Sequence, residues 1–281
     1  ERCVCEQGNR LMSALTMRFM LAERRRSLIG WTLGTIAMIL VMAAVYPSIR
    51  DTGAELEAYI ESLPEGLMDA FGLGGASLTS PEGYLTSQLY SNLYPIILLI
   101  MGIGAATWTI AGAERDGTLE ATLAAPVRRV SVAVQRFLGV AVLTLAVTLL
   151  STAALAAISP PLGLTTDLPW WGVWSAGLTM WALVLLYSAI AFAVGAATGR
   201  SGWAIAAASV AAVIGFLGQV LAALAEPLEW MRVTSPWYWF LEPNPLVTAP
   251  SALSLALPLV LTVLLVTIGA WMFNRRDLSI A

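Results

Sequence analysis

The chain has 281 residues, of which 58% are hydrophobic and only 12% are charged, and its mean hydropathy is +0.77. These values exclude an ordinary soluble domain, and the net charge of −3 is too small to indicate a partner by itself. All 15 basic residues are arginines, and histidine is absent. The chain therefore lacks the lysine of a phosphate-binding loop and the histidine of a haem ligand, a zinc protease or a Ser-His-Asp triad.

The first predicted element is an amphipathic helix over residues 11–26 that lies along the membrane surface. Apolar residues recur on one helical face and three arginines end the segment: Leu11, Leu15, Phe19 and Met20, then Arg24, Arg25 and Arg26. Such an arginine run is typical of a topology anchor.

The residues before this helix carry little information. Glu1 is not a methionine and Met12 is a reasonable natural start, so the origin of residues 1–11 is left open. The leader is too long and too rich in arginine for a secretory signal peptide. Cys3 and Cys5 have no other Cys or His to join them, and a C-x-C pair alone is a poor metal site, so we expect no metal.

Six long apolar runs follow, and each has about the ~20 residues that a helix needs to cross a bilayer. They cover residues 28–46, 89–113, 137–158, 174–198, 203–225 and 252–273. The sequence therefore predicts an all-α polytopic membrane protein, with six transmembrane helices in one transmembrane domain over residues 1–281. None of the runs contains Asp, Glu, Lys, Arg or His. Ion-coupled transporters and channels usually need such groups at membrane depth, so both classes are disfavoured.

The arginines fall almost entirely in alternate gaps between the runs. Thirteen lie on one side, and only Arg50 and Arg232 lie on the other. Because arginine-rich loops stay in the cytoplasm, we expect both termini there, in a multi-pass protein of a bacterial or archaeal plasma (inner) membrane. The arginines are scattered at the ends of the runs and form no basic face. Membrane lipid, and not nucleic acid, is therefore the expected partner.

Two loops on the extracellular side have patterns of their own. The first alternates acidic and apolar residues over Ala54–Phe71, which predicts two short amphipathic pieces on either side of Pro64. The second, residues 226–250, is rich in proline and aromatic residues. Two interpretations fit it: a hairpin at membrane depth, or an ordinary aromatic belt at the bilayer interface.

The cytoplasmic loop of residues 114–129 predicts a short helix that ends before Pro126. Leu119 and Leu123 are spaced to fall on one face of this helix, bordered by charges. The helix is too short to span the membrane, so we expect it to present a small apolar ridge at the surface. Two interpretations are open: a helix packed on lipid headgroups, or a docking element for a soluble partner.

The pattern Glu114-x-x-Gly117-Thr118-Leu119-Glu120-x-x-Leu123-x-x-Pro126-x-x-Arg129, at the end of a second span, resembles the signature loop of ABC-2 type exporter permeases. The resemblance implies that this loop is the coupling helix, which sits in a cleft of an ATP-binding subunit. It also implies an elbow helix at residues 11–26 that helps to contact that subunit, and a re-entrant hairpin before the last span.

Six helices are half of this family's usual translocation unit. The resemblance therefore implies a second permease, the same or a related chain, and two copies of an ABC ATP-binding subunit. ATP and Mg would bind to that subunit, so no cofactor, metal or catalytic residue is expected in this chain.

The function implied by the resemblance is ATP-driven export. The uncharged runs favour a lipophilic or amphipathic substrate, such as a drug, an antibiotic or a lipid, as in multidrug efflux or antibiotic resistance. The alternative is a non-transporting membrane scaffold or sensor subunit with the same fold. Membrane enzymes are disfavoured because the runs carry no catalytic groups.

Overall fold

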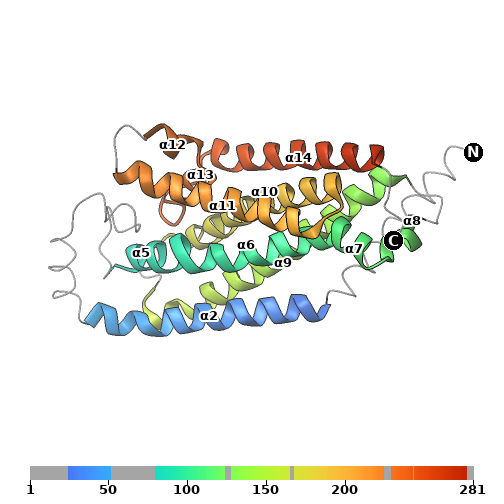
Figure 1. Ribbon diagram of the computed structural model, residues 1–281. Coiled ribbons are helices and arrows are strands. Elements are labelled where there is room, and N and C mark those ends of the chain that lie inside the picture. The colour runs from blue at the N-terminus through green and yellow to red at the C-terminus, as the bar shows by residue number, and fades with distance from the viewer. Residues whose placement is uncertain are drawn as a thin grey trace, which may run out of the picture.

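The computed structural model describes residues 25–51, 80–123, 128–164, 168–224, 229–242 and 244–276, and all regular structure in these ranges is helical. Six of the described helical segments are long and apolar enough to cross a membrane, which confirms the predicted fold class. Five are the single helices α2 (Arg25–Asp51), α9 (Arg129–Ile158), α10 (Gly172–Thr198), α11 (Ser201–Leu224) and α14 (Ala252–Arg275). Figure 1 shows them side by side along one axis.

The second span is a composite helix over Pro81–Arg115. It consists of α5 (Pro81–Tyr84), the π-helical segment η1 (Leu85–Leu93), α6 (Tyr94–Thr107), the π-helical segment η2 (Trp108–Gly112) and α7 (Ala113–Arg115). Ser80 starts it, because its Oγ accepts a hydrogen bond from the Gly83 N–H at 3.1 Å and Pro81 occupies the first turn. The helix thus begins eight residues before the predicted apolar run of residues 89–113.

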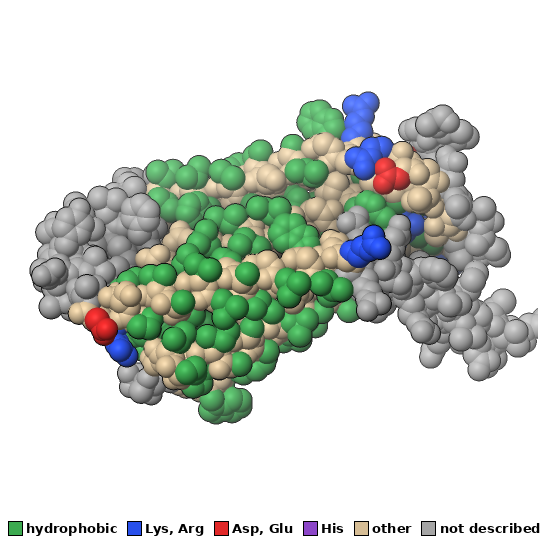
Figure 2. All heavy atoms as spheres, turned by 90° about the horizontal axis from the view of Figure 1, so that it is seen from below, with side chains coloured by type: hydrophobic (Ala, Val, Ile, Leu, Met, Phe, Trp, Pro, Cys, Tyr) green, Lys and Arg blue, Asp and Glu red, His purple; other side chains and the backbone are tan. Residues whose placement is uncertain are grey.

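Helix α10 forms the centre of the bundle. It packs against α6, α9, α11 and α14, while α2 packs on α9 at the edge. In the most apolar stretch of α10, 78% of the residues are buried, whereas in that of α11 only 17% are buried. Figure 2 shows a band of hydrophobic side chains along the middle of the molecule, with charged side chains toward its ends. An outer surface of this kind is suited to lipid or to another membrane protein.

Two ends of the bundle can be distinguished. The α8 end contains α7, the short helix α8 (Thr118–Leu123), the starts of α2 and α9 and the ends of α10 and α14. The α5 end contains α5, the end of α2, the 3₁₀ turn η3 (Pro160–Leu162) and the start of α14. Figure 1 shows α5 and α8 at opposite ends of the long axis.

Several boundaries differ from those predicted. Helix α2 begins at Arg25 and continues through Pro47 to Asp51, so Arg25 and Arg26 lie in its first turn and not in a separate elbow helix. Helix α9 begins at Arg129, eight residues before the predicted run, and so includes Arg136. The rest of the predicted elbow helix, with Arg24, and the pieces at residues 54–71 lie outside the described residues.

The aromatic loop before the last span contains two short helices, α12 (Glu229–Thr234) and α13 (Pro236–Leu241), which pack on α11. Ser235 Oγ donates a hydrogen bond to the Gly215 carbonyl at 2.7 Å, and Trp237 Nε1 donates to the Ala212 carbonyl at 3.3 Å. Trp237 is buried, whereas Trp230 is exposed. This pair of helices therefore lies back along the final turns of α11.

Candidate coupling site

The predicted coupling segment, residues 114–129, begins at the end of the second span and then turns into α8. Gly117 has φ of +69°, a left-handed conformation that glycine adopts without strain, and its N–H donates to the Glu114 carbonyl at 3.1 Å. Thr118 Oγ1 donates to the Ala113 carbonyl at 3.2 Å. Gly117 and Thr118 therefore form the turn that carries the chain from α7 into α8.

Leu119 does not form an exposed ridge. Its side chain is 1% exposed and belongs to the hydrophobic core of the protein. The structure therefore differs from the expected apolar ridge at the surface, because α8 turns Leu119 toward the bundle, and the role of Leu119 in coupling stays a prediction. The side chains of Glu120 and Leu123, and the whole of Pro126, lie outside the described residues.

Arg136 connects α8 to the second span from a buried position in α9. Its side chain Nη1 donates to the Thr109 carbonyl in η2 at 2.5 Å, and Nη2 donates to Thr122 Oγ1 in α8 at 3.0 Å. The residue is 6% exposed. A guanidinium carries five N–H donors in a fixed plane, so it can hold two segments in a defined relation.

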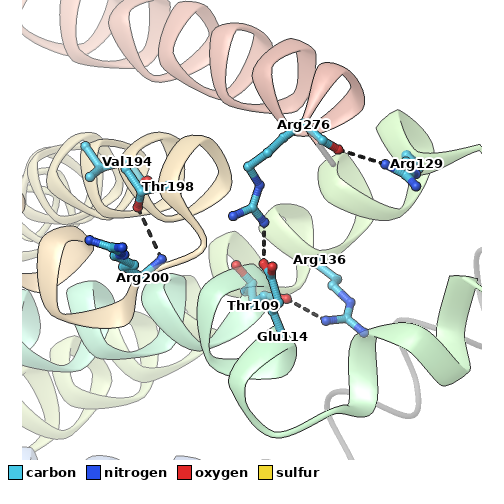
Figure 3. Close-up of polar contacts among 8 residues, drawn as sticks. All are labelled: Thr109, Glu114, Arg129, Arg136, Val194, Thr198, Arg200 and Arg276. Carbon is cyan, nitrogen blue, oxygen red and sulfur yellow. Dashed lines mark hydrogen bonds and ion pairs between the residues drawn. The ribbon is translucent and has the colours of Figure 1, made fainter. Parts of the chain in front are cut away.

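A second group of contacts, the Glu114 cluster, consists of Glu114, Arg129 and Arg276, which Figure 3 shows, together with Gly199. The Glu114 carboxylate in α7 forms an ion pair with the guanidinium of Arg276, the residue after α14. Arg129 Nη1 in α9 donates to the Arg276 carbonyl at 3.0 Å. The cluster therefore joins the second, third and sixth spans at the α8 end.

Gly199 provides the space for this ion pair. It ends α10 with φ of +70°, a conformation that other residues rarely adopt. A Cβ atom at this position would overlap the Arg276 guanidinium and lie 2.9 Å from Glu114 Oε2. Both the backbone and the side chains beside it therefore favour a glycine at this position.

The surface of the α8 end is rich in arginine. Arg115 and Asp116 form an ion pair of 3.0 Å beside the turn, with side chains that are 68% and 42% exposed. Arg275 lies over the Trp271 ring, 4.1 Å from its centroid. Of the arginines whose side chains are described, Arg50 lies at the α5 end and all others lie at the α8 end: Arg26, Arg115, Arg128, Arg129, Arg136, Arg200, Arg275 and Arg276.

Two of the predicted site residues, Glu114 and Arg129, lie near each other because both contact Arg276. Sequence reasoning missed Arg276, Arg136 and Gly199. A signal was present for Arg136, which follows Arg129 by seven residues and so falls on the same helical face. No local pattern connects Arg276 or Gly199 to Glu114.

An apolar groove of about 570 Å³ lies between α6 and α11, beside Trp237. Its lining residues carry no charge: Ile96, Leu99, Ile100, Ile103, Gly104, Ile205, Ser209, Ala212, Val213, Phe216 and Trp237. Such a surface can accept an acyl chain, an apolar ring system or the helix of another subunit, whereas an ion would lose its hydration there.

The described residues contain no group of three or more His, Cys, Asp or Glu side chains that could hold a metal ion. No curated protein matches the chain. A family profile described as "ABC-2 family transporter protein" matches residues 21–278 and so covers all six spans and the coupling segment. Proteins of this family are the transmembrane components of ABC transporters and work with a separate ATP-binding subunit. The chain is therefore a multi-pass membrane protein that belongs to the ABC-2 family of transporters.

Proposed function

We propose that this chain is the transmembrane subunit of an ATP-driven exporter, which moves a lipophilic or amphipathic substrate outward across a bacterial or archaeal inner membrane. The main observation in support is that the family match spans all six helices and includes a coupling segment at the arginine-rich end. The energy comes from a separate ATP-binding subunit, since the chain has no lysine for a phosphate-binding loop.

The α8 end faces the cytoplasm in this proposal. Arginine resists translocation, and all the arginines whose side chains are described, other than Arg50, lie at that end. The coupling segment is then on the side of the membrane where ATP is found, and the α5 end faces outward. Arg275 and Arg200 are exposed there and suit contact with anionic lipid headgroups.

The ATP-binding subunits, two copies in the full complex, dock on the turn between α7 and α8. Arg115, Asp116, Gly117 and Thr118 are all exposed and combine two opposite charges with open space at Gly117, where a Cβ atom would meet no described atom within 4 Å. The buried Leu119 holds this turn on the bundle from behind. The docking surface is thus polar at its exposed part and apolar where it joins the membrane domain.

The substrate is lipophilic or amphipathic because the surfaces available to it are apolar. The groove between α6 and α11 is lined mainly by aliphatic and aromatic groups. Ser209 and Trp237 are its polar members. A second permease, the same chain or a related one, packs beside the apolar outer helices and completes the translocation unit. Drugs, antibiotics and lipids have the matching chemistry.

The test is purification of the chain from its native cell in mild detergent, with identification of the bound proteins and an ATPase assay. We expect a stoichiometric subunit with a Walker motif. Asp116→Arg should remove that subunit, because it reverses the charge beside the docking turn. The matched control is Asp51→Arg, since Asp51 also pairs with the preceding arginine but lies at the α5 end and is 71% exposed.

Two results would contradict the proposal. In the first, no ATP-binding subunit is recovered with a folded chain; in the second, Asp116→Arg and Asp51→Arg retain it equally. A complex whose ATP hydrolysis responds to no lipophilic compound would favour the non-transporting scaffold or sensor. Export of a small hydrophilic solute by the reconstituted complex would contradict the proposed substrate class.

A further inference from the structure

Arg276 joins three segments that are far apart in the sequence. Its backbone N–H donates to the Met272 carbonyl at 3.1 Å and closes the last turn of α14. Its guanidinium pairs with Glu114 in α7, and its carbonyl accepts the hydrogen bond from Arg129 in α9. One residue therefore fixes the end of the last span to the second and third spans (Figure 3).

The Glu114–Arg276 ion pair is shielded from water, unlike the other pairs of the described chain. Its side chains are 12% and 17% exposed, whereas those of Arg50 and Asp51 are 52% and 71% exposed. Water screens exposed charges, so exposed pairs contribute little to holding helices together, while shielded pairs attract more strongly. The Glu114–Arg276 pair can therefore act as a mechanical link.

This ion pair connects α7 with α14, two helices that otherwise have little direct contact. Helix α14 packs along α9, α10 and α13. It meets α7 through the Arg276 side chain, which reaches across the end of α10 beside Gly199. Without Arg276, a displacement of α7 would reach α14 only indirectly, through the helices between them.

We propose that Arg276 is a positioning residue of the transport cycle. It couples α14 to the coupling segment, so that the ATP-binding subunit moves the sixth span together with the second. This inference rests on the proposed function, since it requires an ATP-binding subunit that acts on the turn after α7. It predicts that loss of the ion pair separates the movements of the two spans and leaves the docking surface in place.

The test measures the two movements separately in the purified complex. Cys3 and Cys5 are replaced by serine, and spin labels are attached to cysteines introduced at exposed positions. The pair Ile29–Ile268 reports α14 relative to α2, and the pair Ile29–Leu93 reports the second span relative to α2. Electron–electron double resonance distances are recorded with and without ATP and vanadate, with the labelled copy diluted in unlabelled copies.

Both distances should respond to ATP and vanadate in the wild-type complex and in Arg50→Gln, which breaks the exposed pair at the other end. In Arg276→Gln, the Ile29–Leu93 response should persist and the Ile29–Ile268 response should be lost, with the ATP-binding subunit still bound. A merely structural role would diminish both responses together. Persistence of the Ile29–Ile268 response in Arg276→Gln would overturn the inference.

Failure of the proposed function would look different. In that case the wild-type chain binds no ATP-binding subunit, or neither distance responds to ATP and vanadate. This result overturns the inference as well, because nothing then drives the coupling segment. If Arg276→Gln does not fold, Glu114→Gln, which keeps the shape of the side chain and removes its charge, is judged by the same two outcomes.

Discussion

A glutamate holds each end of the second span to a neighbouring segment, but the two glutamates have chemically different partners. At the α8 end, Glu114 pairs with the charged guanidinium of Arg276. At the α5 end, Glu82 accepts a hydrogen bond from the neutral amide of Asn244, 3.0 Å away, and that amide also donates to Thr86 Oγ1 at 3.0 Å. A shielded ion pair resists separation more than a hydrogen bond to a neutral group does.

The difference indicates which end opens more easily. The α8 end is additionally held by Arg136, which is buried and bonded to both η2 and α8. The α5 end has neutral hydrogen bonds, such as the one from Ser175 Oγ to the Pro245 carbonyl at 2.5 Å. In the proposed exporter the α5 end faces outward, so the more easily separated contacts lie where the substrate leaves.

The largest effect is expected for Leu119→Asp. A carboxylate in the core position of Leu119 should lower the free energy of unfolding by at least about 4 kcal/mol, because the charge loses its hydration without gaining a partner. SDS-induced unfolding in mixed micelles measures this. The control Leu119→Met conserves volume and should cost less than about 1.5 kcal/mol. If Leu119→Asp folds normally and only loses the ATP-binding subunit, Leu119 faces the partner after all.

Glu114→Ala should be the next most destabilising change, at about 3 kcal/mol, because it leaves the shielded Arg276 guanidinium without its counter-charge. The measurement is again SDS-induced unfolding. The comparison between the two ends breaks if Glu114→Ala proves no more destabilising than Glu82→Ala.

Gly199→Ala tests the space around the same ion pair. We expect a loss of about 2 kcal/mol, from the left-handed backbone and from the displaced guanidinium together. In the Glu114→Ala background the same change should cost only about 1 kcal/mol, since Arg276 is then free to move away. Equal losses in both backgrounds, measured by the same unfolding assay, would show that the backbone alone accounts for the effect.

A smaller effect, about 1 kcal/mol, is expected for Glu82→Ala, because it removes one hydrogen bond with a neutral partner. Thr86→Val leaves Asn244 bonded to Glu82 and should lower the free energy of unfolding by less than Glu82→Ala does. If Glu82→Ala lowers the free energy of unfolding as much as Glu114→Ala does, the contacts at the two ends are equally strong.

The sequence predicted the number of spans because each helix that crosses a bilayer needs its own apolar run of about 20 residues. The boundaries were predicted less well. An apolar run was ended before the next charged residue or polar stretch, whereas a helix continues as long as its backbone can pair. Thus α9 begins at Arg129, with Arg136 inside it, and the second span begins at Pro81.

The sequence predicted a short helix after Glu114, because a short helix depends on neighbouring residues, but it did not identify contacts between distant residues. The turn at Gly117 and Thr118 follows from local backbone chemistry. The partner of Glu114 is 162 residues away, and no local pattern could identify it. The spacing of Leu119 indicated an apolar face of α8, but periodicity does not say whether such a face meets the bundle or a partner.

The length of the second span has a mechanical consequence. Its 35 residues extend over about 50 Å at 1.5 Å per residue, whereas the hydrocarbon layer is about 30 Å thick. The helix therefore overhangs the layer, and its two terminal acids lie at headgroup level or beyond. In the proposed exporter, a force that the ATP-binding subunit applies to α7 therefore acts outside the hydrocarbon layer and is passed along the second span to the packed middle of the bundle. The π-helical segment η2, a departure from the regular α-helix, lies at the base of that overhang.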